Sequence, residues 1–254
     1  MEQPITRRRF VGLGAAGATL LAGGRLAGLA AETGPPGAGR LKARPGKPTQ
    51  TVKPGVVDFG LAQGRDGSLY VPESYNPAKP MPLLLMLHGA LGRLENFRTF
   101  SRRASRFGMV VVEPDSRGRT WDFDLTRSGA DIAFLDRALA WAFARVNVDP
   151  HHVALGGFSD GASYALSAGL PNGDLFTHLL AFSPGFIAPS SRQGKPAIWI
   201  SHGTQDEILP VTASRDRIVP QLKQWGYTVR YREFDGPHGV TPEVGEEAFH
   251  WFLA

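Results

Sequence analysis

Residues 153–163 have the sequence VALGGFSDGAS, and this stretch decides the fold because it joins a predicted strand to a predicted helix. Its first four residues form an apolar run of strand length. Residues 157–161 match the pattern G-x-S-x-G, in which small residues allow a sharp turn that lifts the hydroxyl of Ser159 above the sheet. The pentapeptide alone is a weak signal, because a glycine-rich turn with a capping serine has the same sequence.

The chain around this motif alternates short apolar runs with longer helical segments, which is typical of βαβ units and a mainly parallel sheet. Strands are predicted at residues 83–87, 109–112, 153–156, 178–182, 197–201 and 228–234, and helices at 94–107, 131–146, 160–170, 211–225 and 243–252. Asp131 stands where it would cap the second of these helices.

The ends of this alternation define the class of fold. Residues 56–62 and 68–72 flank a turn-rich link and predict an antiparallel β-hairpin at one sheet edge. Residues 183–195 are too few for a large helical cap between two strands. We therefore predict a doubly wound α/β fold with an N-terminal β-hairpin at one edge, a mainly parallel sheet and no large cap domain.

The N-terminus has the pattern of an export signal. Residues 6–11 (TRRRFV) place paired arginines before the weakly apolar residues 10–24, an arrangement that resembles a twin-arginine signal. Small residues suit cleavage by signal peptidase after Ala30 or Ala31. We predict a signal peptide over residues 1–31, export by the twin-arginine (Tat) machinery and a secreted or periplasmic location; the alternative is a basic N-terminus that is not processed.

Residues 32–54 combine Pro, Gly and basic residues with few large apolar side chains, so they predict a disordered linker before a single folded domain at 55–254. Charge supports this division. Residues 1–47 hold eight Arg and Lys against two Glu, a surplus of +6, and the whole chain carries +5, so residues 48–254 carry −1. The basic balance therefore belongs to the leader and tail, and the domain has no nucleic-acid footprint.

The composition excludes several kinds of site. The chain has no Cys, which excludes disulfides, a thiolate nucleophile and a cysteine-ligated metal. It also has no apolar run near the length that a membrane span needs, so we expect no stable span.

Two further residues complete a nucleophilic triad with Ser159. Asp206 follows the predicted strand 197–201, and His238 follows the predicted strand 228–234. This is the chain order of nucleophile, acid and histidine that the G-x-S-x-G fold requires. A neutral imidazole accepts the serine proton, and a buried carboxylate orients that imidazole. In isolation, Asp206 is better explained as an exposed loop aspartate and His238 as a solvated turn histidine; it is their occurrence together, in the required order, that favours the triad.

Other acids and histidines near these positions are weaker candidates. Glu207 is adjacent to Asp206, and Asp235 lies too close in sequence to His238 to reach round to it. His202 precedes Asp206 and therefore does not fit the required order. We predict Asp206 as the acid.

An oxyanion hole needs two backbone N–H donors. Asp160, directly after the serine, supplies one, and the loop HGALG at residues 88–92 is expected to supply the other from Ala90, with Leu91 as the alternative. His88 is predicted to brace this loop. Possible pocket walls are Trp121, Phe123, Phe186 and Leu209, together with Leu91, although the aromatic residues have the composition of core side chains as well.

The segments LHGALG (87–92), GFSDGAS (157–163), SHGTQDEILP (201–210) and DGPHGV (235–240) together resemble the α/β-hydrolase superfamily. They are most similar to the phospholipase/carboxylesterase and dienelactone-hydrolase-like esterases, with some likeness to polyhydroxybutyrate-depolymerase-type esterases. The resemblance implies the same triad and oxyanion donors, and hydrolysis of carboxylic esters with no cofactor and no metal.

We therefore expect an exported serine hydrolase that cleaves a small-molecule ester. Three alternatives stay open: a thioesterase, a peptidase of the same fold, and a binding protein that keeps the scaffold without activity. Asp160 occupies a place that these families often give to Gln, Asn or Met, which leaves the choice of substrate open.

Overall fold

The computed structural model describes residues 39–92, 94–125 and 129–254, all of which belong to one compact unit, 32–254. The predicted signal peptide, 1–31, and residues 32–38 lie outside the described residues. None of the helices within the described ranges is both long and apolar enough to cross a membrane.

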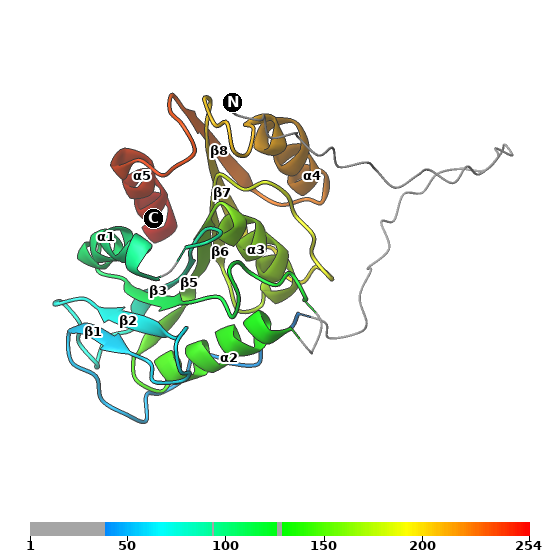
Figure 1. The fold of residues 1–254 in the computed structure, drawn as a ribbon. Coiled ribbons are helices and arrows are strands. Elements are labelled where there is room, and N and C mark those ends of the chain that lie inside the picture. The colour runs from blue at the N-terminus through cyan, green and yellow to red at the C-terminus, as the bar shows by residue number, and fades with distance from the viewer. Residues whose placement is uncertain (1–38, 93, 126–128) are drawn as a thin grey trace, which may run out of the picture. The chain divides into compact units, whose positions relative to one another are not determined.

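The core of the unit is an eight-stranded sheet in the order β1-β2-β4-β3-β5-β6-β7-β8 (Figure 1). Strands β3 to β8 are parallel, whereas β2 is antiparallel to both β1 and β4. The strands are β1 (Gly55–Asp58), β2 (Gly67–Val71), β3 (Met81–Leu87), β4 (Val110–Pro114), β5 (Val148–Phe158), β6 (His178–Phe182), β7 (Ala197–Gly203) and β8 (Val229–Phe234). The predicted doubly wound sheet and its edge hairpin are therefore confirmed.

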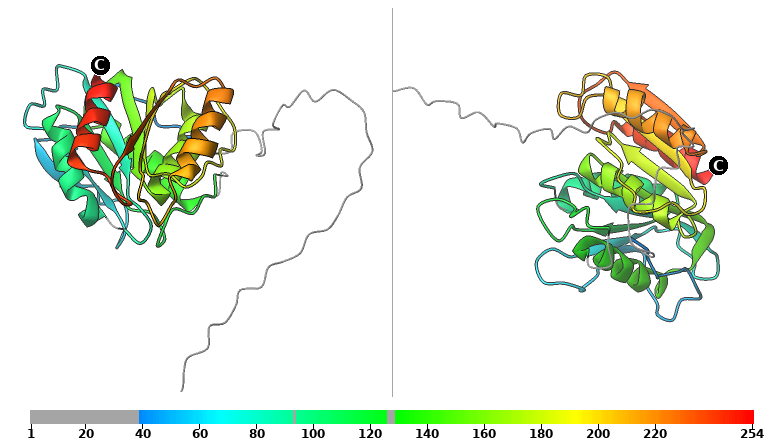
Figure 2. Two further views of the ribbon diagram at one scale, coloured as in Figure 1. Left: turned by 90° about the horizontal axis from the view of Figure 1, so that it is seen from above. Right: turned by 90° about the vertical axis from the view of Figure 1, so that its right-hand side faces the viewer.

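Helices cover both faces of the sheet, and the alternation of side chains along each strand explains how (Figure 2). Leu83 and Leu85 of β3 belong to a core cluster with residues of α2, α3 and α4, whereas Leu84 and Met86 join residues of α1 and α5 on the opposite face. The helices are α1 (Leu94–Arg106), α2 (Ala130–Phe143), α3 (Asp160–Gly169), η1 (Leu170–Asn172), η2 (Ala213–Ile218), α4 (Val219–Gln224) and α5 (Pro242–Leu253). Both faces of β3 are thus buried, as its continuous apolar sequence predicts.

The helix predicted at 211–225 is divided in the structure. Ala213–Ile218 has π-helical hydrogen bonding, and the α-helix begins only at Val219. Pro220 stands in the first turn of α4, where its missing N–H costs nothing, but in the middle of one continuous helix it would remove a hydrogen bond.

The prediction of a disordered linker over 32–54 is wrong for residues 39–54. Leu41 is 2% exposed and belongs to the core cluster of α2 and α3. Its N–H donates to Asn172 Oδ1 at 2.8 Å, and Arg40 and Arg44 both contact Asp174 Oδ2 at 2.7 Å. Composition missed this docking because one buried leucine and a few specific acceptors on the domain, rather than an extended apolar run, hold the segment.

Asp131 does not cap α2, contrary to the prediction. The residue before the helix is Gly129, and it provides no side-chain cap. The buried carboxylate of Asp131 instead accepts from the N–H groups of Arg117 at 2.5 Å and Asp122 at 2.7 Å. Burial raises the pKa of Asp131, and these bonds oppose the rise. Asp131 therefore holds the loop between β4 and α2, one of the loops around the site described next.

Candidate active site

Ser159 occupies a strained turn between β5 and α3. Its backbone has φ 57° and ψ −123°, a conformation that non-glycine residues rarely adopt. A Cβ on Gly157 would lie 2.2 Å from the carbonyl oxygen of Gly161, and a Cβ on Gly161 would lie 2.4 Å from the carbonyl oxygen of His88. Both glycines of the motif are thus required by close backbone contact, and the turn is the sharp one that the sequence predicts.

The structure brings the three predicted triad residues together. His238 Nε2 lies 2.9 Å from Ser159 Oγ, and His238 Nδ1 lies 2.6 Å from Asp206 Oδ2. The serine follows β5, the aspartate follows β7 and the histidine follows β8, so all three stand at the carboxyl edge of the parallel sheet. With Nδ1–H donating to the carboxylate, Nε2 is free to accept the serine proton.

The environment of Asp206 keeps its carboxylate ionised. Its side chain is fully buried, and burial alone would raise its pKa. The hydrogen bond from His238 and the N–H groups of Leu209 (2.8 Å) and Ile208 (2.9 Å) outweigh this effect, and the pKa of Asp206 is lowered. The alternative acids are placed elsewhere: Glu207 is exposed, and Asp235 is exposed and accepts from Gln205 Nε2 at 2.6 Å.

His202, which chain order excludes as the catalytic base, is nevertheless part of the site. Its side chain is completely buried, with Nε2 3.1 Å from Asp206 Oδ2 and 2.7 Å from the carbonyl oxygen of Leu209. Its Nδ1 lies 2.8 Å from Ser214 Oγ. Chain order excludes His202 as the catalytic base, but it does not exclude a histidine that holds the acid. The signal available in the sequence was its position four residues before Asp206.

Two backbone N–H groups near Ser159 are suitable as an oxyanion hole. A Cβ built on Gly89 would lie 3.2 Å from Ser159 Cβ, so the loop after β3 lies against the serine. Among the turn, loop and cap hydrogen bonds of the described residues, none is donated by the backbone N–H of Ala90 or of Asp160. The N–H of Leu91, the alternative donor, is engaged by the carbonyl oxygen of Arg119 at 2.8 Å. The geometry thus favours the pair predicted from the sequence.

His88 braces this loop, as expected. It is 2% exposed, its Nε2 accepts from the N–H of Ser116 at 3.0 Å, and its Nδ1 lies 2.7 Å from the carbonyl oxygen of Gly89. Burial lowers the pKa of His88, so the imidazole is neutral with its proton on Nδ1. Trp121 Nε1 donates to the carbonyl oxygen of His88 at 2.8 Å.

The five predicted pocket-wall residues have different surroundings. Trp121 is 1% exposed and stacks on Tyr164 in the core, so the expectation that it lines a pocket is wrong and the core alternative holds. Phe123 packs on Phe186 with ring centroids 4.8 Å apart, and Phe186 is 44% exposed. Leu91 is 70% exposed, and Leu209 lies beside Gly185, where an added Cβ would be 3.0 Å from Leu209 Cδ2.

Backbone strain is concentrated around Ser159. In the described residues, the non-glycine positions with positive φ are Leu91, Phe123, Ser159 and Ser183. They lie in the segments that follow β3, β4, β5 and β6, all at the carboxyl edge of the sheet. Strained backbone of this kind clusters at functional sites, so these loops belong with the triad.

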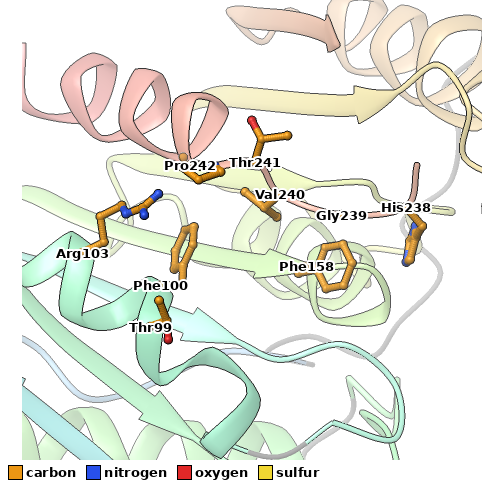
Figure 3. A pocket seen from close by; sticks show the side chains of 10 residues that line it. Thr99, Phe100, Arg103, Phe158, His238, Gly239, Val240, Thr241 and Pro242 are labelled. Atoms are coloured by element: carbon orange, nitrogen blue, oxygen red, sulfur yellow. The ribbon is translucent and has the colours of Figure 1, made fainter. Parts of the chain in front are cut away.

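A pocket of about 450 Å³ opens beside His238, between α1 and the start of α5 (Figure 3). None of the predicted wall residues lines it. Its lining consists of Thr99, Phe100, Arg103, Phe158, His238, Gly239, Val240, Thr241, Pro242 and Gly245. The sequence did not predict this pocket, because it is formed by two helices that are far apart in the chain.

The described residues contain no cluster of three or more His, Asp or Glu side chains that could hold a metal ion. The chemistry that the site supports is built from the serine, the histidine and the aspartate, which are joined by hydrogen bonds. An imidazole within hydrogen-bond reach of a hydroxyl, and oriented by a carboxylate, is the arrangement of nucleophilic catalysis.

Curated proteins are similar to this chain over part of its sequence. Feruloyl esterase C of Emericella nidulans is 24% identical over 157 residues, which cover 58% of this chain and 57% of the relative. The bifunctional acetylxylan esterase/xylanase XynS20E of Neocallimastix patriciarum is 30% identical over 166 residues, 61% of this chain and 23% of the relative. The chain thus spans little more than half of the first relative and a quarter or less of the second.

Solved structures support the fold. Esterase PE8 has a TM-score of 0.62 and 24% identity, over 74% of this chain and 97% of its own. The Staphylococcus aureus serine hydrolase FphF has a TM-score of 0.63 and 14% identity, over 79% of this chain and 99% of its own. The family described as "Putative esterase" matches residues 61–226, a range that includes Ser159 and Asp206. By this match the chain belongs to the putative esterase family, and its sheet has the order and direction of the α/β-hydrolase fold.

Proposed function

We propose that this protein hydrolyses carboxylic esters through a covalent acyl-enzyme on Ser159. The observation that carries the proposal is the continuous hydrogen-bonded series from Ser159 Oγ through His238 to Asp206, with distances of 2.9 and 2.6 Å. Membership of the esterase family supports the same reaction.

In the proposed mechanism, His238 Nε2 takes the proton of Ser159 Oγ as that oxygen attacks the ester carbonyl. The resulting oxyanion accepts from the N–H groups of Ala90 and Asp160, and Asp206 stabilises the imidazolium. The imidazolium then gives its proton to the departing alcohol, and the acyl group stays on the serine. A water molecule, deprotonated by His238, hydrolyses the acyl-enzyme in the second half of the reaction and restores the free hydroxyl.

We propose that the acyl group lies near Leu91, Phe123, Phe186 and Leu209. These residues follow four different strands at the same edge as Ser159, and Leu91 and Phe186 expose apolar surface there. The names of the relatives suggest which acids to test. One relative is named a feruloyl esterase and another an acetylxylan esterase. Esters of an aromatic acid and of a short acid are therefore both informative test substrates for the acyl site.

Export by the twin-arginine route and cleavage by signal peptidase remain part of the proposal. They rest on Arg7 and Arg8 before the apolar residues 10–24. Replacing both arginines with lysine is expected to leave the protein in the cytoplasm. Immunoblots of cytoplasmic and extracytoplasmic fractions test this, and unchanged export of the variant would contradict it.

The activity is tested with a panel of nitrophenyl esters of increasing acyl length, together with a thioester and a peptide that carry the same acyl group. We expect hydrolysis of the oxygen esters by the wild type and its loss in Ser159→Ala. Preference for the thioester or the peptide would favour one of the other reactions of this fold. A folded wild-type protein that cleaves none of them would favour a binding protein.

A further inference from the structure

The pocket beside His238 has a place in the proposed reaction that neither the family nor the relatives assign. We propose that it receives the departing alcohol of the substrate, and that this alcohol is an uncharged aryl or alkyl group rather than a sugar. The inference rests on the proposed function, since it assumes that His238 protonates the leaving group.

The position of the pocket selects the alcohol rather than the acid. During acylation the imidazolium must place its Nε2 proton on the leaving oxygen, so that oxygen lies next to His238. The alcohol extends from this oxygen, whereas the acyl chain extends from the carbonyl carbon toward the other side of Ser159. A hollow whose rim is His238 is therefore on the leaving-group side, and Ser159 is not among the residues that line it.

The walls of the pocket select an apolar group. Phe158 packs on the imidazole of His238 with ring centroids 4.7 Å apart, and Phe100 packs edge-on against the core ring of Phe249 at 5.1 Å. In Figure 3, Phe158, Val240 and Phe100 lie between His238 and Arg103. A volume of about 450 Å³ is within the range of small-molecule sites and is large enough for a benzyl group.

The charge at the far end is balanced. Arg103 Nε lies 3.7 Å from Glu246 Oε1, and both side chains are partly exposed. The pair leaves no uncompensated charge to attract an ionic substrate. Thr99 and Thr241 bring hydroxyls to the lining, but six of its ten residues have no polar side-chain atom: Phe100, Phe158, Gly239, Val240, Pro242 and Gly245. A neutral apolar alcohol fits this mainly apolar lining best.

The test compares esters of one acid with different alcohols. Methyl, benzyl and glucosyl acetate all form the same acetyl-enzyme, so differences in kcat/KM report the acylation step and therefore the alcohol. Methanol and benzyl alcohol have similar acidity, so their intrinsic leaving ability is similar. We expect kcat/KM for benzyl acetate to exceed that for methyl acetate by about tenfold or more, from burial of the ring, and glucosyl acetate to be a poorer substrate than benzyl acetate.

A substitution in the lining tests whether the preference for benzyl acetate over methyl acetate arises in this pocket. Val240 lies close to Phe100 and Gly245 in the pocket, and Val240→Phe is expected to fill it and reduce the benzyl-to-methyl ratio by about tenfold. Val56→Phe makes the same change at a half-exposed valine of β1 and is expected to keep the wild-type ratio. The ratio of kcat/KM for the two substrates is unaffected by a general loss of activity in a variant. Titration with a small fluorophosphonate measures the concentration of functional active sites.

The outcomes separate the two proposals. Hydrolysis of none of the acetates, without fluorophosphonate labelling, would contradict the proposed function itself. Hydrolysis with a benzyl-to-methyl ratio near one, a ratio that Val240→Phe does not reduce, or a preference for glucosyl acetate would each overturn the alcohol pocket while leaving ester hydrolysis intact. A high ratio that falls only in Val240→Phe supports the inference.

Discussion

His202 Nε2 lies 3.1 Å from Asp206 Oδ2, the same carboxylate oxygen that contacts His238 Nδ1 at 2.6 Å. The Nε2–H of His202 also reaches the carbonyl oxygen of Leu209 at 2.7 Å. His202 therefore connects the end of β7 to the far side of the loop that carries the acid. This contact restricts the rotation of the carboxylate and keeps Oδ2 directed at His238.

We expect His202→Phe, which keeps a ring but removes the N–H, to reduce kcat/KM by about tenfold, since a buried hydrogen bond to a charged group contributes about 1.5–3 kcal/mol. His202→Gln retains an N–H donor and is expected to recover part of the loss. The rate of fluorophosphonate labelling should fall in parallel, because the serine loses activation rather than substrate binding. Wild-type labelling rates in a folded His202→Phe variant would show that the contact has no role in positioning.

Gly161→Ala tests the close approach behind Ser159. The added Cβ would meet the carbonyl oxygens of His88 at 2.4 Å and Leu87 at 2.5 Å, so the backbone must move. We expect a loss of about 1–3 kcal/mol in the free energy of unfolding, and a loss of labelling larger than the fraction unfolded explains. Urea titration and labelling measure the two effects. Gly46→Ala, where a Cβ meets nothing within 4 Å, is the control.

Leu41→Ala tests whether the segment before β1 is part of the folded domain. Because Leu41 is 2% exposed in the main core, its truncation should lower the free energy of unfolding by about 2–5 kcal/mol. The exposed Lys42, mutated to Ala, should change it little. Equal free energies of unfolding for the two variants in chemical denaturation would contradict this docking and favour a disordered linker at residues 39–54.

His178 makes stability depend on pH far from the site. Burial, and then the neighbouring His152, lower the pKa of His178 from 6.5 to about 4. Between these values the unfolded chain binds a proton that the folded chain does not, so the free energy of unfolding falls as the pH drops from 6.5 to 4. The full shift would correspond to about 3 kcal/mol, and because His178 is only partly buried, solvent screening reduces the effect on stability below this value.

Urea titrations across this pH range measure the effect, with His178→Gln as the comparison. The variant should have a flatter dependence on pH, because it lacks the group that titrates. Parallel curves for the two proteins would assign the acid sensitivity to other groups.

The regular parts of this fold were predictable because each has a local cause. The apolar runs at 83–87 and 179–182 are continuous, as strands buried on both faces require, and the glycines beside Ser159 mark the turn. The positions of Asp206 and His238 after their strands follow from the same alternation. In a parallel sheet these ends meet at one edge, so the juxtaposition of the three residues was accessible from order alone.

The features that escaped prediction depend on contacts outside the regular elements, and most of these contacts join distant segments. Asp131 has the residue type of a helix cap, but its carboxylate accepts from the N–H groups of Arg117 and Asp122 in the loop that leads into its own helix. Residues 39–54 resemble a linker in composition, and the side chains that fix them, such as Asn172 and Asp174, lie about 130 residues away. The pocket at His238 likewise exists only once α1 and α5 are side by side.

The central claim, that His238 and Asp206 activate Ser159 as a nucleophile, is tested most directly by labelling with a fluorophosphonate and mapping the adduct by mass spectrometry. We predict a single adduct on the peptide that contains Ser159 in the wild type, no adduct in Ser159→Ala, and strongly slowed labelling in His238→Ala. Absence of labelling in folded wild-type protein, or equal labelling of Ser159→Ala, would contradict the account.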